Sequence, residues 1–175
     1  MKTPCRLSLV VGILALGAAL PMFAQVSQQT QQVTVTASIP ELMNLTIEGT
    51  AVNIAFTQSD YASDGTGSKL AINATTLRIA SNTSWILQVQ ADSADFSYDG
   101  VTVPNKPCGD LAVSAFSTST YLPVGIINTE IARGEPGGNS VAANNVPVSY
   151  KLNSTLVGDP PGNYTLTLTY TILAQ

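Results

Sequence analysis

The sequence predicts an all-β protein: a single antiparallel β-sandwich of Greek-key-like connectivity over residues 33–175, with few or no helices. Three observations support this prediction. Apolar and polar residues alternate with a period of two in run after run, which is typical of strands with one face in a core and the other in water. Gly, Pro, Asp and Asn cluster between these runs, as turns require. No stretch keeps the 3.6-residue period of an amphipathic helix, so successive strands are expected to pair antiparallel in a sandwich or a barrel.

The expected strands follow one another along the whole chain. The alternating runs occupy residues 33–39, 52–56, 77–79, 85–89, 146–152 and 164–172. The last run is the most regular, because Thr stands at every second position between aromatic and aliphatic residues. Turn-forming residues separate the runs at 64–67, 99–100, 134–138 and 159–162. The residues expected to contribute to the core are Trp85, Leu87, Val148, Tyr150, Leu166, Leu168 and Tyr170.

The N-terminus has the three parts of a secretory signal peptide. Lys2 and Arg6 form a basic start, residues 7–20 are apolar, and Ala24 offers a small residue for cleavage. The apolar run is short for a membrane span, which needs about 20 residues, and no second run of that length follows. We therefore expect residues 1–24 to be removed and residues 25–32 to form a flexible polar lead-in. The mature protein is expected to be secreted, extracellular and associated with the cell surface, with no integral membrane segment.

The composition excludes several classes of function. Of the 175 residues, 45% are hydrophobic and only 10% are charged, which excludes a charge-rich disordered chain. The absence of His excludes His-based catalysis and His metal sites. Seven basic residues against 11 acidic ones disfavour nucleic acid as a partner, because phosphate binding needs cations. We expect a protein that is not an enzyme, with no cofactor, no catalytic residues and no metal site.

Cys108 is the one cysteine that remains after residue 24. It could form an intermolecular disulfide or act as a nucleophile, which requires a lowered thiol pKa. Only Lys106 lies close enough in the sequence to lower that pKa, and the chain has no His to serve as a base. We therefore expect an incidental loop thiol.

Acidic residues are the other candidates for chemistry. The Asp residues within 60–64 and 92–99 could offer oxygen ligands to calcium, but their spacing does not match a calcium-binding loop, and we expect solvated turns. Paired carboxylates can hydrolyse glycosides, and the candidate pairs are Glu41 with Glu48 and Glu130 with Glu135. One Trp and few other aromatic residues are available to stack a sugar, so a glycosidase is not expected.

Two short motifs occur in the order typical of one family of bacterial surface proteins. The first is Trp85-Ile86-Leu87, which directly follows a small polar turn. In the second, within residues 164–172, Tyr170 and Ile172 stand where that family has Trp and Leu. The sequence therefore resembles a divergent WxL domain. The residues that carry the resemblance are Trp85, Leu87, Tyr164, Leu168, Thr169, Tyr170 and Ile172.

The resemblance implies a non-enzymatic surface or envelope protein that adheres non-covalently to cell wall glycan or to partner surface proteins. An alternative of another class is a fimbrial, pilin-like subunit. The alternation of residues 33–39 suits a strand donated to a neighbouring subunit, which would lead to self-assembly. Ala174 in place of a penultimate aromatic residue and the missing Cys pair depart from the pilin pattern. A third class, a carbohydrate-binding module, would need exposed aromatic residues on one face.

Overall fold

The computed structural model describes residues 31–101, 104–117 and 119–175. The chain divides into an N-terminal unit, Met1–Ser38, and a compact unit, Ile39–Gln175. In the N-terminal unit, the described residues 31–38 are exposed and have no regular secondary structure. The predicted signal peptide (1–24) and residues 25–30 of the predicted lead-in lie outside the described residues.

The described part of the compact unit forms ten strands and three single-turn 3₁₀ helices, with no α-helix. The strands are β1 (Met43–Glu48), β2 (Thr66–Ser81), β3 (Trp85–Ala91), β4 (Ser97–Tyr98), β5 (Leu111–Ala115), β6 (Leu122–Pro123), β7 (Thr129–Gly134), β8 (Asn145–Thr155), β9 (Tyr164–Thr165) and β10 (Leu168–Ala174). The 3₁₀ helices are η1 (Gln58–Asp60), η2 (Cys108–Asp110) and η3 (Ala142–Asn144). The predicted all-β class is confirmed.

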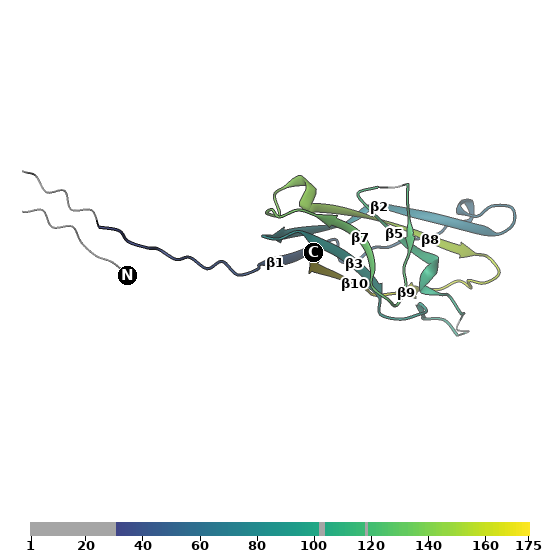
Figure 1. Cartoon of the computed structure of the whole chain (residues 1–175). Coiled ribbons are helices and arrows are strands. Elements are labelled where there is room, and N and C mark those ends of the chain that lie inside the picture. Colours follow the sequence, from purple (N-terminus) through teal and green to yellow (C-terminus); the bar gives the residue numbers. More distant parts are fainter. Residues whose placement is uncertain (1–30, 102–103, 118) are drawn as a thin grey trace, which may run out of the picture. The chain divides into compact units, whose positions relative to one another are not determined.

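Two antiparallel sheets pack against each other to form the sandwich (Figure 1). The larger sheet has the strand order β1-β2-β8-β5-β6, and the smaller has the order β10-β3-β7. A separate two-stranded pair, β4 and β9, connects the segment that follows β3 with the segment that precedes β10. Every strand pair in these sheets is antiparallel, so the predicted antiparallel sandwich is confirmed as well.

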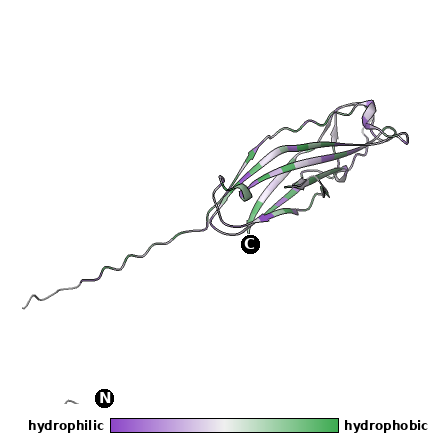
Figure 2. Cartoon of the chain, turned by 90° about the horizontal axis from the view of Figure 1, so that it is seen from above, coloured by the Kyte–Doolittle hydropathy of each residue, from purple (hydrophilic) through white to green (hydrophobic). Residues whose placement is uncertain are grey.

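The core lies between the inward faces of β2, β3 and β8. In β3 every second residue from Trp85 to Ala91 is buried, and Leu77 and Ile79 of β2 face them from the other sheet. Hydrophobic and hydrophilic residues alternate along the strands in Figure 2, as a one-sided burial requires. Of the predicted core residues, Trp85, Leu87, Val148 and Tyr150 are buried, whereas Leu166, Leu168 and Tyr170 are partly buried and pack against the core.

Residues 33–39, predicted as the first strand, form no strand, and the first strand of the structure is β1. Alternation makes a segment suitable for a sheet, but a strand also needs a hydrogen-bonded neighbour. None of the described residues pairs with this segment through its backbone. The prediction of a strand inside the same chain was therefore wrong.

Residues 52–56, also predicted as a strand, lie outside the sheets although Val52, Ile54 and Phe56 are partly buried. The β1–β2 ladder ends at Glu48 and Thr76, and the backbone is irregular directly beyond both residues. Gly49 has a positive φ of 79°, and the pairing of β2 with β8 shifts its register between Ala71 and Thr75, as at a β-bulge.

The run predicted over residues 164–172 is divided in the structure into β9 and β10. The division falls at residues 166–167, where the backbone carbonyl of Thr167 accepts a hydrogen bond from the backbone N–H of Asp92. Five strands were not predicted: β1, β4, β5, β6 and β7. β5 is buried at almost every position, so it carries no alternation from which a half-buried strand could be recognised.

No helix among the described residues has the length and apolar character that crossing a membrane requires.

Candidate functional site

The structure brings the two WxL-like motifs together on neighbouring strands. Trp85 and Leu87 belong to β3, and Leu168 to Ile172 belong to β10, which pairs with β3. In this pairing Ile172 lies opposite Leu87 and Ala174 lies opposite Trp85. The motif residues on β3 and β10 therefore form one structural unit, whereas Tyr164 lies apart from them on β9, opposite Tyr98 of β4.

Trp85 has a packing role in this unit. Its side chain is fully buried, and its indole lies directly on Gly134 of β7, the residue paired with it. A Cβ atom at position 134 would overlap the indole ring, so only glycine fits there. The indole Nε1 has no hydrogen-bond partner among the described residues. A side chain enclosed in this way cannot contact a surface ligand directly.

Tyr170, which replaces the second Trp of the family, links the two sheets through its hydroxyl. This hydroxyl lies 2.8 Å from the hydroxyl of Tyr150 on β8, which in turn donates to Thr75 Oγ1 of β2 at 2.8 Å. Burial and the neighbouring Tyr150 raise the pKa of Tyr170, so its phenol stays protonated at neutral pH. Leu168 and Ile172 are partly buried beside it, and Thr169 is exposed.

The acidic residues proposed for chemistry serve turns and surface ion pairs. Asp64 accepts hydrogen bonds from the backbone and side chain of Thr66, and those bonds lower its pKa. Asp99 accepts from Asn163 in the same way and its pKa is also lowered. No group of His, Cys, Asp or Glu suited to a metal ion occurs in the described ranges.

The candidate glycosidase pairs have other partners in the fold. Glu48 forms an ion pair with Arg78 at 2.7 Å, and Glu130 pairs with Arg133 at 2.7 Å. Glu135 accepts a hydrogen bond from Ser84 Oγ at 2.9 Å, and Glu41 is exposed. Each of the three engaged carboxylates therefore already has a structural role at the surface.

Cys108 is a core residue, because it is buried and its thiol points to the backbone carbonyl of Val124 at 3.5 Å. An intermolecular disulfide would require this thiol at the surface. The expectation of an incidental thiol agrees with this placement, but the residue lies at the start of η2 and packs with the core.

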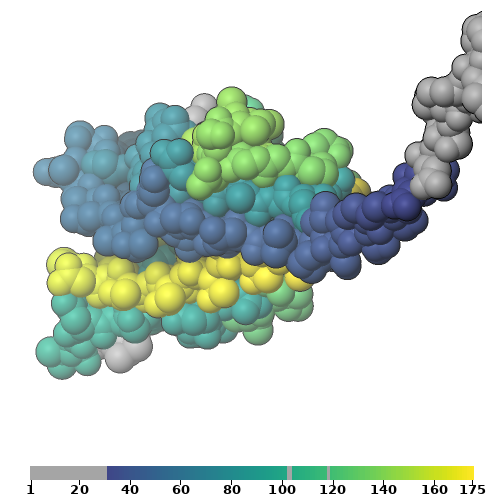
Figure 3. Space-filling model, turned by 90° about the vertical axis from the view of Figure 1, so that its left-hand side faces the viewer, coloured from purple at the N-terminus to yellow at the C-terminus, as the bar shows by residue number. Residues whose placement is uncertain are grey.

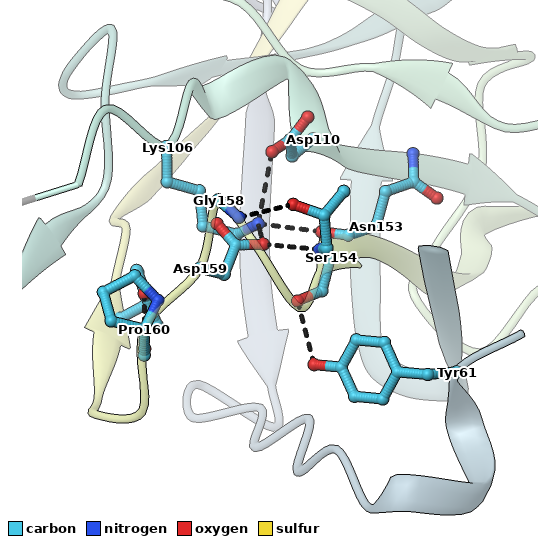
Figure 4. A network of polar contacts seen from close by, with 10 residues as sticks. Tyr61, Lys106, Asp110, Asn153, Ser154, Gly158, Asp159 and Pro160 are labelled. Atoms are coloured by element: carbon cyan, nitrogen blue, oxygen red, sulfur yellow. Dashed lines mark hydrogen bonds and ion pairs between the residues drawn. The ribbon is translucent and has the colours of Figure 1, made fainter. Parts of the chain in front are cut away.

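A buried lysine that the sequence analysis did not propose as a site residue, Lys106, is the centre of a network of polar contacts (Figure 4). Lys106 Nζ lies 2.7 Å from Asp159 Oδ2 and 3.2 Å from Asp110 Oδ2, and it donates to the backbone carbonyl of Asn153 at 2.9 Å. Only 2% of the lysine side chain is exposed. Two of these groups come from loops far apart in sequence, so the cluster joins the segment before η2 to the turn after β8.

Two opposing influences act on the carboxyl group of Asp159. Burial raises its pKa, whereas hydrogen bonds from Lys106, the Thr155 backbone and Ser154, together with the Lys106 charge, outweigh burial and lower it. Nearby, burial and the Asp159 charge raise the pKa of Tyr164 to about 12. No local pattern in the sequence pointed to this site, because Lys106, Asp110 and Asp159 meet only in the folded chain.

One side of the sandwich, which we call the closed side, is held together by backbone hydrogen bonds. The backbone N–H of Val124 donates to Leu111 of β5 at 2.8 Å, and the carbonyl of Gly125 accepts from Ala91 of β3 at 2.8 Å. A single crossing segment is thereby bonded to both sheets. Val124 of this segment and Val113 of β5 are buried almost completely.

The opposite side, which we call the open seam, is formed by β1 and β10. They are the terminal strands of the two sheets, and they contact each other without any backbone hydrogen bond between them in the described structure. Figure 3 shows the blue segment that contains β1 running alongside the yellow C-terminal strand. The inward side chains of the open seam are only partly buried, and they are Met43, Leu45, Leu168, Tyr170 and Ile172.

The terminal strands differ in how their edges are protected. Natural sheets usually protect an edge with charged residues, proline or a bulge. β7 has Glu130 and Arg133, β6 has Pro123, and β1 ends in Glu48. β10, with the sequence Leu-Thr-Tyr-Thr-Ile-Leu-Ala, has none of these devices. Its edge is the one most open to another strand.

Residues 33–39 present a complementary row of side chains. Val33 is 86% exposed, Val35 is 85% exposed and Ile39 is 79% exposed. These large aliphatic residues and Ala37 stand at every second position of a segment without a partner in the described structure, and Thr and Ser stand between them.

Comparisons with known proteins do not place the chain in a family: no family model matches it, and no curated protein matches it.

Proposed function

We propose that the protein is an exported, non-enzymatic surface or envelope protein that joins its neighbours by strand donation. In this proposal, residues 33–39 of one subunit add as an extra strand to the open seam of the next. The observation that carries the proposal is the exposed, unpaired alternation of Val33, Val35 and Ile39. Extended peptides commonly bind proteins by adding a strand to an exposed sheet edge.

The proposed acceptor is the free edge of β10. Its inward residues Leu168, Tyr170 and Ile172 are spaced by two, as are the aliphatic residues of the donated segment. An added strand would pair with the unpaired backbone groups of β10 and would cover side chains that are only partly buried. Both the backbone pairing and the burial of apolar surface favour binding, because the paired backbone groups supply affinity and apolar burial contributes about 25 cal/mol per Å².

The proposal of a non-enzymatic role is supported by how the polar residues are used. The turn acids accept hydrogen bonds from their neighbours, and the buried thiol of Cys108 faces a backbone carbonyl. Lys106, the most enclosed ionisable group, has three protein acceptors around it and so is used within the fold.

The oligomeric state tests this proposal. The full chain is expected to form oligomers in size-exclusion chromatography with light scattering. The double variant Val33→Asp, Val35→Asp is expected to be monomeric, because it would place two charges in the apolar seam. The matched control Thr34→Asp, Thr36→Asp changes the other side of the same segment and is expected to retain the oligomers.

Two outcomes contradict the proposal. One is a wild-type chain that stays monomeric at every concentration, and the other is equal loss of oligomers in both double variants. Thr169→Pro and Thr171→Pro, placed on β10, provide the acceptor-side test. Because proline disrupts edge pairing, at least one of them is expected to weaken assembly.

A second candidate function is adhesion to cell wall glycan, which the resemblance to the WxL domain implies. The observation that favours it is a hollow of about 210 Å³ formed by the segment after β3, by β4 and by β9 with the residues that follow it. Its lining residues are Asp92, Ser93, Asp95, Phe96, Ser97, Thr165 and Thr167. Carboxylates and hydroxyls are groups that can bind sugar hydroxyls, whereas the Phe96 ring is buried and does not offer a face for a sugar to stack on.

Sedimentation with purified peptidoglycan tests this second candidate. Binding is expected to weaken in Asp92→Ala and Asp95→Ala, and to persist in the Val33→Asp, Val35→Asp variant, whose changes lie elsewhere. Failure of the wild-type protein to sediment with the glycan would exclude this candidate without affecting strand donation.

A further inference from the structure

We propose that Lys106 and Asp159 become joined by an intramolecular amide bond between Lys106 Nζ and Asp159 Cγ. This inference is independent of strand donation, because it concerns the interior of one subunit. The two groups are 2.7 Å apart, and their side chains are exposed by only 2% and 11%. In Figure 4 the lysine side chain extends directly to the Asp159 carboxyl group, with Asp110 on its other side.

The setting holds an amine and a carboxyl group against each other in a region with little water. Phe96 and Tyr164 lie with their ring centroids 6.0 Å and 5.8 Å from Nζ. The backbone carbonyl of Asn153 fixes Nζ, and the backbone N–H of Thr155 donates to Asp159 Oδ2 at 2.9 Å. Groups fixed within reach of each other react far faster than the same groups free in solution.

The reaction is a condensation that needs no partner molecule. The Lys106 ammonium gives a proton to Asp159 Oδ2, which leaves a neutral amine and a neutral acid. Burial favours this exchange, whereas the hydrogen bonds and the Lys106 charge that together hold the pKa of Asp159 low oppose it, so the neutral pair is the minor form that reacts. The amine lone pair then attacks Cγ, and the new C–N bond forms a tetrahedral intermediate.

Asp110 is the proton carrier of the second half of the reaction. Its Oδ2 lies 3.2 Å from Nζ, close enough to accept a proton from the nitrogen and deliver it to the departing oxygen. The C–O bond to Oδ2 breaks, and this oxygen leaves as water. One ammonium and one carboxylate thus become one amide and one water, so that atoms, electrons and charge balance.

The chain contains a matched pair for comparison. Lys69 Nζ lies 2.8 Å from Asp60 Oδ2, which is the same chemistry at nearly the same distance. These side chains are 32% and 21% exposed, and among the described residues no second carboxylate is paired with Lys69. Water keeps this pair ionised, so we expect it to stay unlinked.

Mass spectrometry of the intact, folded full chain tests the proposal once the N-terminus of the sample has been sequenced. The wild-type mass is expected to be about 18 Da below the sequence mass, which corresponds to the loss of one water. Lys69→Met is expected to show the same deficit relative to its own sequence, and Lys106→Met is expected to show none. A wild-type mass equal to the sequence mass overturns the proposal.

Peptide mapping separates the cross-link from a simpler dehydration. Asp64-Gly65 and Asp99-Gly100 can lose water by forming a cyclic imide, which leaves the peptides linear. The proposal requires a branched peptide that contains both Lys106 and Asp159, and a deficit found only on linear peptides overturns it. If Lys106→Met does not fold, Asp110→Asn keeps the reacting pair. It is expected to accumulate the branched peptide at least tenfold more slowly.

Discussion

The closed side and the open seam of the sandwich differ in how the two sheets are joined. On the closed side, the segment at Val124 and Gly125 donates to one sheet and accepts from the other. On the open seam, β1 and β10 lie in contact with no backbone bond between them in the described structure. One side of the core is therefore completed within the chain, whereas the other retains apolar surface that a further strand could cover.

The largest loss of stability is expected where the core is complete. Trp85→Ala removes a fully buried indole and leaves Gly134 beside a cavity, so the free energy of unfolding is expected to fall by about 3–5 kcal/mol. Guanidinium unfolding followed by circular dichroism measures the change. Thr169→Ala, at an exposed position of the other motif, is expected to stay within about 0.5 kcal/mol. A small effect of Trp85→Ala would show that the indole is not a packing residue.

A pair of leucines on adjacent strands compares the two kinds of position directly. Leu87→Ala, at a fully buried site, is expected to cost about 2–5 kcal/mol. Leu168→Ala, at the open seam, is expected to cost less than about 2 kcal/mol, because its side chain is only partly withdrawn from water. The comparison requires a monomeric background, which Val33→Asp, Val35→Asp supplies. Equal losses would mean that the seam is as closed as the core.

The hydroxyl that bridges the sheets beside the open seam has a smaller expected effect. Tyr170→Phe removes its hydrogen bond to Tyr150, and the free energy of unfolding is expected to fall by about 1 kcal/mol. Tyr121→Phe is the matched control, since the Tyr121 hydroxyl is buried without a partner among the described residues. This control is expected to leave stability unchanged or to raise it slightly. An unchanged free energy of unfolding in Tyr170→Phe would show that this hydrogen bond does not stabilise the open seam.

The smallest expected effect on stability concerns Asp60, which lies neither on the closed side nor at the open seam. Hydrogen bonds from Lys69 and Thr57 lower the pKa of Asp60 to about 2 from its ordinary 3.8. A carboxyl group whose pKa is lowered by folding stabilises the protein above its unfolded pKa, and that stabilisation disappears as the pH falls through the folded pKa. Asp60→Asn is therefore expected to flatten the loss of stability between about pH 4 and pH 2. Acid unfolding curves of both proteins would show this, and unchanged curves would contradict it.

The sequence predicted the fold where alternation coincides with one-sided burial. β3, β8 and the core positions Trp85, Leu87, Val148 and Tyr150 were found because a half-buried strand has a period of two. β5 was missed because it is buried at nearly every position. Residues 33–39 have a strand pattern without a strand, since the pattern describes what a segment can pair with and not whether that partner lies in the same chain.

The candidate site was predicted in part. The alternation of residues 33–39 gave the donor segment of the alternative hypothesis. The motif residues proved to be neighbours on β3 and β10, except Tyr164, which lies on β9. The Lys106 cluster was not predicted, because Lys106, Asp110 and Asp159 meet only through tertiary folding. Nothing in local pattern or spacing distinguishes a lysine that is enclosed by two loops from one that lies in water.

The contact between β1 and β10 has a mechanical consequence for an assembly built by strand donation. A pulling force would enter each subunit through the segment before β1 and leave through the strand added beside β10. Because these strands end their respective sheets, the force would act along the β1–β2 and β10–β3 ladders. When the force acts along a ladder, the two strands can slide past each other only if all of the hydrogen bonds between them break at once. A fibre of these subunits would therefore have its tensile strength in two long ladders, while the turns around Lys106 would carry little tension.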